Sequence, residues 1–282
     1  MNVLSIDIGG TKFQVSMVTE NGEILKTSKC LTPKSIDAEV LYGSLESLII
    51  PYLEHYTFEV VGVGCGGPMA REGELVSPLN IAGWRDFPLK SRLKELVGRE
   101  VFIDNDAKAI TLAELYFGAG RGRSDFVGMV VSTGVGAGIV ADGHLIDGRS
   151  WNAGHIGHVQ VVPEGHLCAC GARGCLEAEI SGLSTQKILG VSADQAPVDW
   201  MRHSGDLLAR AVASSAALLD FDSVFVGGSV ALGYGSPFFE SANLALQKYA
   251  RLDFLEKLEI FPTSLGADFA SLSGAAVALY RL

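Results

Sequence analysis

The sequence predicts an α/β protein made of two domains that share one internal order. Its 282 residues are many for a single hydrophobic core and suit two modest domains. Residues 2–117 and 125–282 each begin with short apolar strands joined by glycine-containing turns and continue into segments of helical spacing. Each half has a threonine beside glycine in its first turn, IDIGGTKFQV and VVSTGVGAGIV. We therefore expect a duplicated architecture with a boundary near Asp106.

The first half is expected to open with a strand meander. Turns at Gly9-Gly10 and Asn21-Gly22 separate apolar runs over 2–8, 12–19 and 22–30, which read as three strands. Apolar residues recur at helical spacing over 38–55 and 107–117. The remaining expected elements are a strand at 59–65, a short helix at 89–97 and a strand at 101–103.

The second half is expected to repeat this order. Strands are predicted at 125–132, 137–142 and 144–147, followed by a helix at 207–219 and a strand at 223–226. A helix at 238–248, a strand at 258–262 and a small-residue helix at 271–282 complete it. No apolar run approaches the length of a membrane span, and the start lacks the pattern of a secretion signal. These features predict a cytoplasmic protein without a membrane partner.

The charge of the chain argues against a nucleic-acid partner. The formal net charge is −10 and no cluster of lysine and arginine occurs. Proteins that bind nucleic acid in general present a basic face to the phosphates. The composition therefore predicts no nucleic-acid partner.

The segment AGHIGHVQVVPEGHLCACGARGCLE, residues 153–177, predicts a metal site. Cys168, Cys170 and Cys175 fall within eight residues, ten positions after His158. One histidine and three cysteines are a sufficient tetrahedral set for structural Zn²⁺. An odd number of cysteines, five in all, in a reducing compartment favours metal over disulfides. The flanking His155, His158 and Glu177 could grip a polyhydroxylated substrate.

Glycine-rich turns in both halves are candidate nucleotide sites. Glycine lets backbone N–H groups approach a phosphate, and a carboxylate at a strand end can hold Mg²⁺. Two such turns, one in each domain, would hold the phosphates of a nucleotide from both sides, and a third would support the adenosine. Each also fits an ordinary strand turn. The residues concerned are Asp7, Gly9, Gly10, Thr11 and Lys12 in the first half, and Thr133, Gly134, Gly136, Gly227 and Gly228 in the second.

The Asp104-Asn105-Asp106 segment follows a strand and is a candidate catalytic site. A carboxylate there can take a proton from a substrate hydroxyl, a contribution of about 10²–10⁴ in rate. Asn105 could fix a neighbouring sugar hydroxyl. Such a segment is also typical of a helix N-cap, so both interpretations stay open.

These motifs together resemble one family. DIGGTK, Gly-Gly-Pro at 66–68, PLNIAGW at 78–84, DNDAKA at 104–109, STGVGAG, AGHIGH with CxCGxxGCxE, and VGGSVA occur in its order. The chain resembles a full-length ROK-family sugar kinase (repressor, open reading frame, kinase), from the first strand to LSGAAVAL. The cysteine segment is the most specific of the motifs, since the others occur more widely in the actin and hexokinase-like superfamily.

The resemblance implies a fold and a domain division. The fold would be α/β, with two actin-like or hexokinase-like (ribonuclease H-like) domains and an interdomain cleft that closes over sugar and ATP. A small N-terminal domain would comprise 1–106 plus 268–282, and a large C-terminal domain 107–267 with the zinc loop. The family also implies a homodimer.

The resemblance implies roles for single residues as well. Asp106 would be the base that deprotonates the sugar 6-hydroxyl for attack on the γ-phosphate of ATP, with Mg²⁺ neutralising charge. His158, Cys168, Cys170 and Cys175 match the zinc ligands, and His158 would offer its second ring nitrogen to the sugar. The substrate-binding positions match Gly67, Asn80, Asn105, Asp106, His158 and Glu177, together with position 155.

His155 departs from the family pattern, which has glutamate there near C1 and C2 of the sugar. A carboxylate only accepts hydrogen bonds, whereas neutral histidine offers one donor and one acceptor. A donor would favour an acetamido carbonyl at C2, and AGHIGH resembles bacterial N-acetylmannosamine kinases, enzymes of sialic acid breakdown. The alternatives are a glucokinase or a broader hexose or glycoside kinase of the same family, with His155 a tolerated change. A sugar-responsive repressor is disfavoured, because the chain starts at the phosphate strand with no room for a helix-turn-helix.

Overall fold

The computed structural model describes all residues, 1–282, as two compact units. Unit 1 comprises Met1–Arg121, Asp147–Ala153 and Leu265–Leu282, and unit 2 comprises Gly122–Ile146 and Gly154–Ser264. Each unit contains one five-stranded mixed sheet with helices, so the predicted two-part α/β fold class is confirmed. The domain bounds expected from the sequence, 1–106 with 268–282 and 107–267, stay a prediction.

Unit 1 is built on a sheet in which three parallel strands adjoin an antiparallel meander. Its order is β3-β2-β1-β4-β5, where β1 pairs antiparallel with β2 and parallel with β4. The bounds are β1 Asn2–Ile8, β2 Lys12–Thr19, β3 Ile24–Leu31, β4 Val60–Cys65 and β5 Glu100–Asn105.

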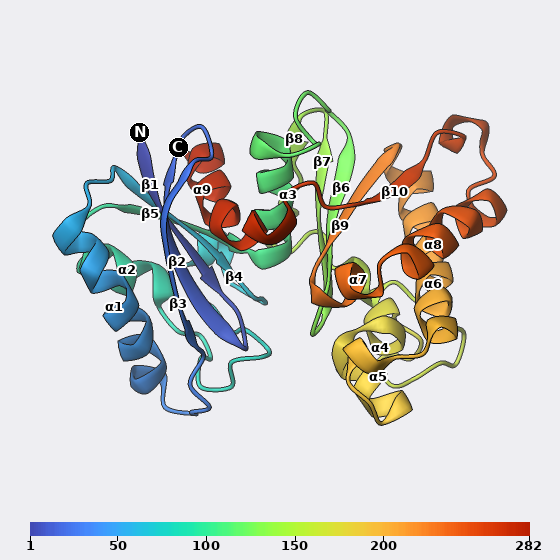
Figure 1. Ribbon diagram of the computed structural model, residues 1–282, viewed down its shortest axis with the longest axis horizontal. Coiled ribbons are helices and arrows are strands. Elements are labelled where there is room, and N and C mark those ends of the chain that lie inside the picture. Colours follow the sequence, from blue (N-terminus) through green and yellow to red (C-terminus); the bar gives the residue numbers. More distant parts are fainter. The chain divides into compact units, whose positions relative to one another are not determined.

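Helices cover both faces of this sheet. Figure 1 shows α1 (Ala38–His55) and α2 (Leu89–Val97) on one face, and α3 (Asp106–Phe117) and α9 (Phe269–Arg281) on the other. Gly62 of β4 and Gly274 of α9 let the strand and the helix approach closely, because a Cβ on Gly62 would lie 1.9 Å from the Gly274 carbonyl oxygen. Strand and final helix therefore pack backbone against backbone.

Unit 2 repeats the topology of unit 1. Its sheet order is β10-β9-β6-β7-β8, with β6 antiparallel to β7 and parallel to β9, so β6 takes the place that β1 has in unit 1. The predicted duplication is thus present in strand order as well as in sequence. The bounds are β6 Phe126–Val131, β7 Val135–Ala141, β8 His144–Leu145, β9 Ser223–Gly227 and β10 Glu259–Pro262.

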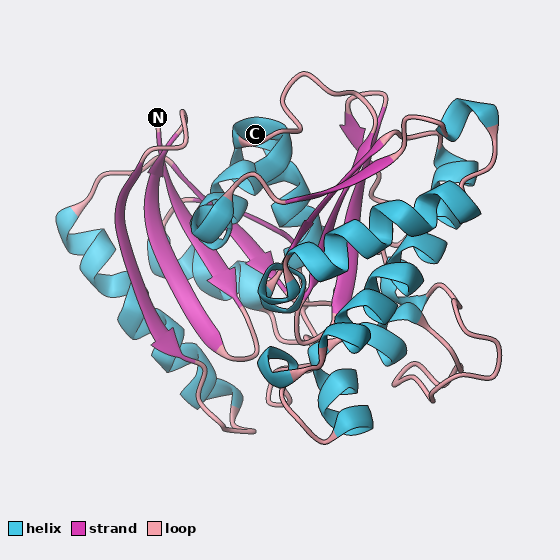
Figure 2. Ribbon diagram, turned by 45° about the vertical axis from the view of Figure 1, so that its right-hand side comes forward, coloured by secondary structure: helices cyan, strands magenta, loops and turns pink.

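The helices of unit 2 include three that the sequence analysis does not predict. These are α4 (Leu176–Ile180), α5 (Gly182–Leu189) and α7 (Ser229–Tyr234). The others are α6 (Val198–Leu219) and α8 (Ser236–Tyr249), shown as helices in Figure 2. Single 3₁₀ turns occur in both units, at Arg71–Gly73, Ile156–His158, Ala193–Gln195, Asp253–Leu255 and Gly266–Asp268.

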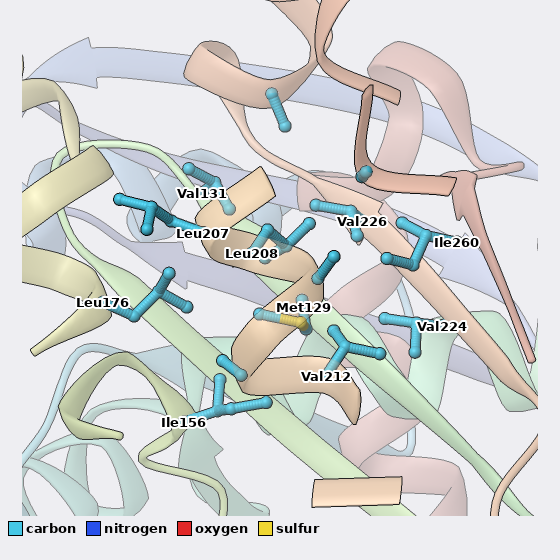
Figure 3. Close-up of a cluster of buried hydrophobic side chains, with 14 of the residues drawn as sticks. Met129, Val131, Ile156, Leu176, Leu207, Leu208, Val212, Val224, Val226 and Ile260 are labelled. Carbon is cyan, nitrogen blue, oxygen red and sulfur yellow. The ribbon is translucent and has the colours of Figure 1, made fainter. Parts of the chain in front are cut away.

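The core of unit 2 lies between its sheet and α6. Met129 and Val131 of β6 meet Leu207, Leu208 and Val212 of the helix, all fully or almost fully buried (Figure 3). Leu176 and Ile156 join the same cluster. The segments before and after the cysteines are therefore anchored in the core. None of the helices in either unit combines the length and apolar character that a membrane crossing requires.

Candidate functional site

The site residues predicted in unit 1 gather at one edge of its sheet. The strand register aligns Ile8 of β1, Cys65 of β4 and Asn105 of β5 in one row. These three strands are parallel, so the residues that follow them leave the sheet at the same edge. The turn after Asp7, the Gly66-Gly67 loop and Asp106 are placed there by the topology.

Asn105 and Asp106 form the start of α3. The Asn105 side chain caps the helix by accepting from the Ala107 N–H at 3.0 Å, while its amide nitrogen lies against Gly67. Asp106 Oδ1 accepts from the same N–H at 2.9 Å, and its Oδ2 lies beside Gly66. The segment is therefore a helix cap, and that cap holds the Asp106 carboxylate at the sheet edge.

Asp7 lies close to Asp106 inside the unit. Burial and, to a smaller extent, the negative charge of Asp106 raise the pKa of Asp7 to about 7, against the opposing charge of Lys12. Two neighbouring carboxylates of like charge are the kind of oxygen ligands that a divalent cation binds. The residues present thus fit a Mg²⁺ ion at this edge.

Asn80 lies directly against the β1–β2 turn. A Cβ on Gly10 would meet the Asn80 Cβ at 2.5 Å, so only glycine allows this approach. Next to it is a cavity of about 710 Å³, lined by Gly10, Thr11 and Asn80 and by the connection from β3 to α1, including Leu31 and Ile36. Unit 1 therefore offers a hollow beside both its glycine turn and Asn80.

In unit 2, Glu177 of α4 contacts the β6–β7 turn. Its Oε2 accepts from the Val135 N–H at 2.9 Å, and a Cβ on Gly134 would lie 2.7 Å from that oxygen. The predicted sugar ligand Glu177 and the predicted phosphate turn with Thr133, Gly134 and Gly136 are therefore brought together.

The second glycine turn of unit 2 lies beside the first. Gly228 has φ +98°, and a Cβ there would meet the Val131 carbonyl oxygen at 2.4 Å. The Ser132 and Ser229 hydroxyls are 3.1 Å apart. Gly227 pairs with Val130 in the parallel β6–β9 ladder. The two turns assigned to the nucleotide thus form one surface at the ends of β6 and β9.

His158 and the three cysteines form a compact cluster in unit 2. Their ligand atoms all lie within 4.8 Å of one another. The His158 Nδ1 to Cys168 Sγ distance is 3.5 Å, and the Cys170 and Cys175 sulfurs are 3.7 Å apart. Zn–S bonds of about 2.3 Å and Zn–N bonds of about 2.0–2.1 Å give tetrahedron edges of about 3.6–3.8 Å. The predicted four-residue set fits zinc in donor type and spacing.

The surroundings of the three cysteines shift the pKa values of their thiols in different directions. Burial raises the pKa of Cys168. Burial and the hydrogen bonds to the neighbouring cysteines together raise the pKa of Cys175 to about 12. Cys170 accepts a backbone hydrogen bond from Ala172, which lowers its pKa. A bound metal would have to displace protons from the two buried thiols.

Sequence reasoning missed a pair that supports the cysteine loop. Glu179, almost completely buried in α4, accepts from the His166 backbone N–H and pairs with the His166 Nδ1, both at 2.7 Å. Gly165 packs against the same carboxylate. The available signal was a second acidic residue two positions after Glu177. The pair ties the loop before Cys168 to the helix after Cys175.

His155 lies next to the cluster of His158 and the three cysteines. Its ring stacks on that of His158, with centroids 6.0 Å apart and planes at 18°. His158 ends the 3₁₀ turn Ile156–His158, and His155 directly precedes that turn. A change at position 155 therefore acts on a ring that adjoins a predicted zinc and sugar ligand.

Comparison with known proteins identifies the class. The chain is 30% identical to a glucokinase from Thermotoga maritima, over all of this chain and 98% of the relative. It is 35% identical to an N-acetylmannosamine kinase from Citrobacter koseri, over 83% and 86% of the two chains. Its structure resembles that of a Streptomyces griseus ROK family glucokinase in complex with glucose and AMPPNP, with 28% identity, 99% coverage of each chain and a TM-score of 0.86.

Fold and relatives together define a sugar kinase with two α/β units. The ROK family model matches residues 3–281, and the chain belongs to the ROK family. The resemblance drawn from the motifs is therefore confirmed. The roles of the individual site residues stay predictions, in two sets, one on each unit.

Proposed function

We propose that this protein transfers the γ-phosphoryl group of ATP to the 6-hydroxyl of N-acetylmannosamine, as a step in sialic acid breakdown. The observation that carries the proposal is the placement of Asp106. Its carboxylate is held by the α3 cap at the edge where Asp7, Gly66 and Asn105 also lie. A carboxylate so fixed can take the hydroxyl proton as the oxygen attacks phosphorus.

The remaining residues bind and orient. Asn80, Gly67 and Asn105 of unit 1, and His155, His158 and Glu177 of unit 2, would hold the sugar. The glycine turns of the two units would hold ATP, whose Mg²⁺, once bound, neutralises charge on the phosphates. Zinc at His158, Cys168, Cys170 and Cys175 would be structural, and with Nδ1 facing the cysteines it would leave the His158 Nε2 for a sugar hydroxyl.

N-acetylmannosamine is favoured by the residue at position 155 and by the Citrobacter koseri relative. The second candidate is glucose, supported by the Thermotoga maritima glucokinase, which aligns with the whole chain. A cytoplasmic location and a homodimer also remain proposals. Light scattering of the purified protein tests the dimer.

A sugar panel tests the function. The protein is assayed by coupled ADP release with N-acetylmannosamine, N-acetylglucosamine, mannose and glucose. We expect the highest kcat/KM for N-acetylmannosamine, no turnover of its 6-deoxy analogue, and competitive inhibition by that analogue. Robust glucose turnover without N-acetylmannosamine turnover would replace the substrate assignment with the glucokinase alternative.

The base assignment has its own control. Asp106→Asn keeps the shape of the helix cap and removes the proton acceptor, so kcat should fall by about 10²-fold or more with sugar binding retained. Turnover near that of the wild type in this variant would show that another group is the base.

A further inference from the structure

A cluster of four charged side chains lies on either side of Asp106 in unit 1. Asp104 precedes Asp106 by two residues and Lys108 follows it by two, and both side chains are fully buried. Asp147 and Arg281 complete the cluster with 21% and 16% exposure. Two anions and two cations balance one another, as buried charges require.

The contacts within the cluster are dense. Lys108 Nζ donates to Asp147 Oδ1 at 3.0 Å and lies 3.7 Å from Asp104 Oδ1. The Arg281 guanidinium joins the two carboxylates, with its Nε 3.2 Å from Asp104 Oδ2 and its Nη1 2.8 Å from Asp147 Oδ2. Burial raises the pKa of Asp104, and the two cations oppose that rise. Loss of any one partner would leave a buried charge uncompensated.

Asp147 begins a segment with an unusual place in the chain. Asp147–Ala153 belongs to unit 1, although the residues on both sides of it belong to unit 2. Trp151 gives the segment a second contact with the cluster. Its carbonyl accepts from Lys108 Nζ at 3.2 Å, and the centroid of its ring lies 4.6 Å from the Arg281 guanidinium carbon. Asn152 donates to the Met69 carbonyl at 3.3 Å.

The segment therefore contacts two parts of unit 1 that lie at the sheet edge with Asp106. Through Lys108 and Asp104 it meets the end of β5 and the first turn of α3, and through Asn152 it meets the loop that follows Gly67. Beyond Ala153 the chain continues at once into Gly154 and His155. One end of the segment is therefore fixed beside Asp106 by the ionic cluster, and its other end continues into His155, a predicted sugar-binding residue.

We propose that Asp104, Lys108, Asp147 and Arg281 are positioning residues for Asp106: the ionic cluster fixes the β5–α3 junction and the Asp147–Ala153 segment so that the Asp106 carboxylate is held in line with the sugar hydroxyl. None of the four touches the reacting atoms in this role. The inference rests on the proposed function, because it assigns these residues to the same reaction. A displacement of about 1 Å in a catalytic group can cost about 10²-fold in rate, so residues that fix the position of Asp106 can affect kcat without contacting the substrate.

Arg281 is the residue to vary, because it is partly exposed and ends the last helix. Arg281→Met removes the charge and the two-pronged contact, whereas Arg281→Lys keeps the charge alone. We expect kcat to fall about ten-fold or more in Arg281→Met and less in Arg281→Lys, with the KM values for sugar and ATP within about two-fold of wild type. Added guanidinium ion should restore part of the lost kcat in Arg281→Met.

Arg123→Met is the matched control. Arg123 also pairs with an aspartate, Asp222 at 3.3 Å, but both side chains are well exposed and lie in unit 2. We expect wild-type kinetics from it. Asp147→Asn provides a second, nearly isosteric test, and combining it with Arg281→Met should cost less than the sum of the two single losses, because the charges are removed as a pair.

The outcomes separate the inference from the function on which it rests. If folded Arg281→Met and Asp147→Asn keep kcat within two-fold of wild type, the positioning role is wrong while the kinase assignment stands. If Arg281→Met does not fold, Arg281→Lys decides in the same way: a lower kcat at unchanged KM supports the role, and unchanged kcat overturns it. If the wild type phosphorylates no sugar of the panel, the proposed function is what fails.

Discussion

The carboxylate of Glu177 accepts a hydrogen bond from the Val135 backbone N–H at 2.9 Å, across the turn that contains Gly134. Glu177 is assigned to the sugar and the turn to the nucleotide. In the proposed function, this one hydrogen bond would join sugar recognition to nucleotide recognition within unit 2. The absence of a side chain at Gly134 is what leaves room for it.

Gly134→Ala should damage activity more than stability. The added methyl group would lie 2.7 Å from Glu177 Oε2, and the flexible glutamate can yield without disturbing the core. Its carboxylate would then leave the position from which it meets the sugar. We expect kcat/KM for the sugar to fall about ten-fold or more, with a melting temperature close to that of wild type.

Gly233→Ala is the control for that change. Gly233 lies in α7 of the same unit, with open space where the methyl group would go. It should leave kcat/KM unaltered. Equal kinetics for Gly134→Ala and wild type would show that Glu177 does not need its contact with the turn.

Zinc should be present at about one ion per chain, by the four-ligand rule. Cys175→Ser is expected to lose the metal, to melt at a lower temperature and to lose most activity, because the loop that carries His158 would no longer be held. Cys30→Ser, in unit 1 and outside the cluster, should keep both metal and activity. Elemental analysis and calorimetry measure these outcomes.

The affinity for zinc should also rise with pH. Burial raises the pKa of the Cys168 and Cys175 thiols, so protons compete with the metal for both sulfurs. Fully active protein with no bound metal after metal-replete expression would contradict the assignment.

Asp7→Asn should stabilise the protein at alkaline pH. The pKa of Asp7 is raised by burial and by Asp106 from 3.8 to about 7 in the folded state. A folded-state pKa above the unfolded one means that the folded chain holds the proton more tightly, so stability falls as pH rises from about 4 to 7 and then levels off. The penalty above pH 7 is on the order of a few kcal/mol, and asparagine does not incur it.

Thermal melts in Mg²⁺-free buffer test this difference. The melting temperature of Asp7→Asn should exceed that of wild type by several degrees at pH 8, and by much less at pH 5. Its kinase activity should be low at both values, because the carboxylate is assigned to Mg²⁺. A variant less stable than wild type at pH 8 would show that Asp7 is not penalised by its surroundings.

Much of the fold followed from local patterns. The strands over 2–8 and 12–19 and the helix over 38–55 match β1, β2 and α1 residue for residue, because their apolar periodicity is set by the sheet and helix they build. The start of α6 does not follow from such a pattern: the apolar spacing predicts a helix from Leu207, whereas α6 begins at Val198. Gly205 within it is explained only by packing, since a Cβ there would meet the Phe238 carbonyl oxygen of α8 at 2.3 Å.

The same limit applies to the site. The zinc set was predictable because its ligands are close in sequence and chemically specific, and the structure gathers all four. The charged cluster beside Asp106 could not be predicted, because Arg281 and Asp104 are 177 residues apart in the sequence and each alone resembles a surface charge. Single residues reveal their chemistry in sequence, whereas their partners are set by the tertiary structure.

His155→Glu should change the choice of sugar. The His155 ring stacks on His158, a predicted ligand of both zinc and sugar. Replacing it with glutamate removes the only hydrogen-bond donor at that position. The acetamido carbonyl of N-acetylmannosamine would then lack its partner, and a site discriminates strongly against a substrate whose polar group it leaves unpaired. The ratio of kcat/KM for N-acetylmannosamine to that for glucose should therefore fall by about ten-fold or more, with zinc content unchanged. His144→Glu makes the same change in charge at an exposed position of β8 and should leave the ratio as it is. An unaltered ratio in His155→Glu would mean that the acetamido group is recognised elsewhere, and the cavity beside Asn80 would be the next place to vary.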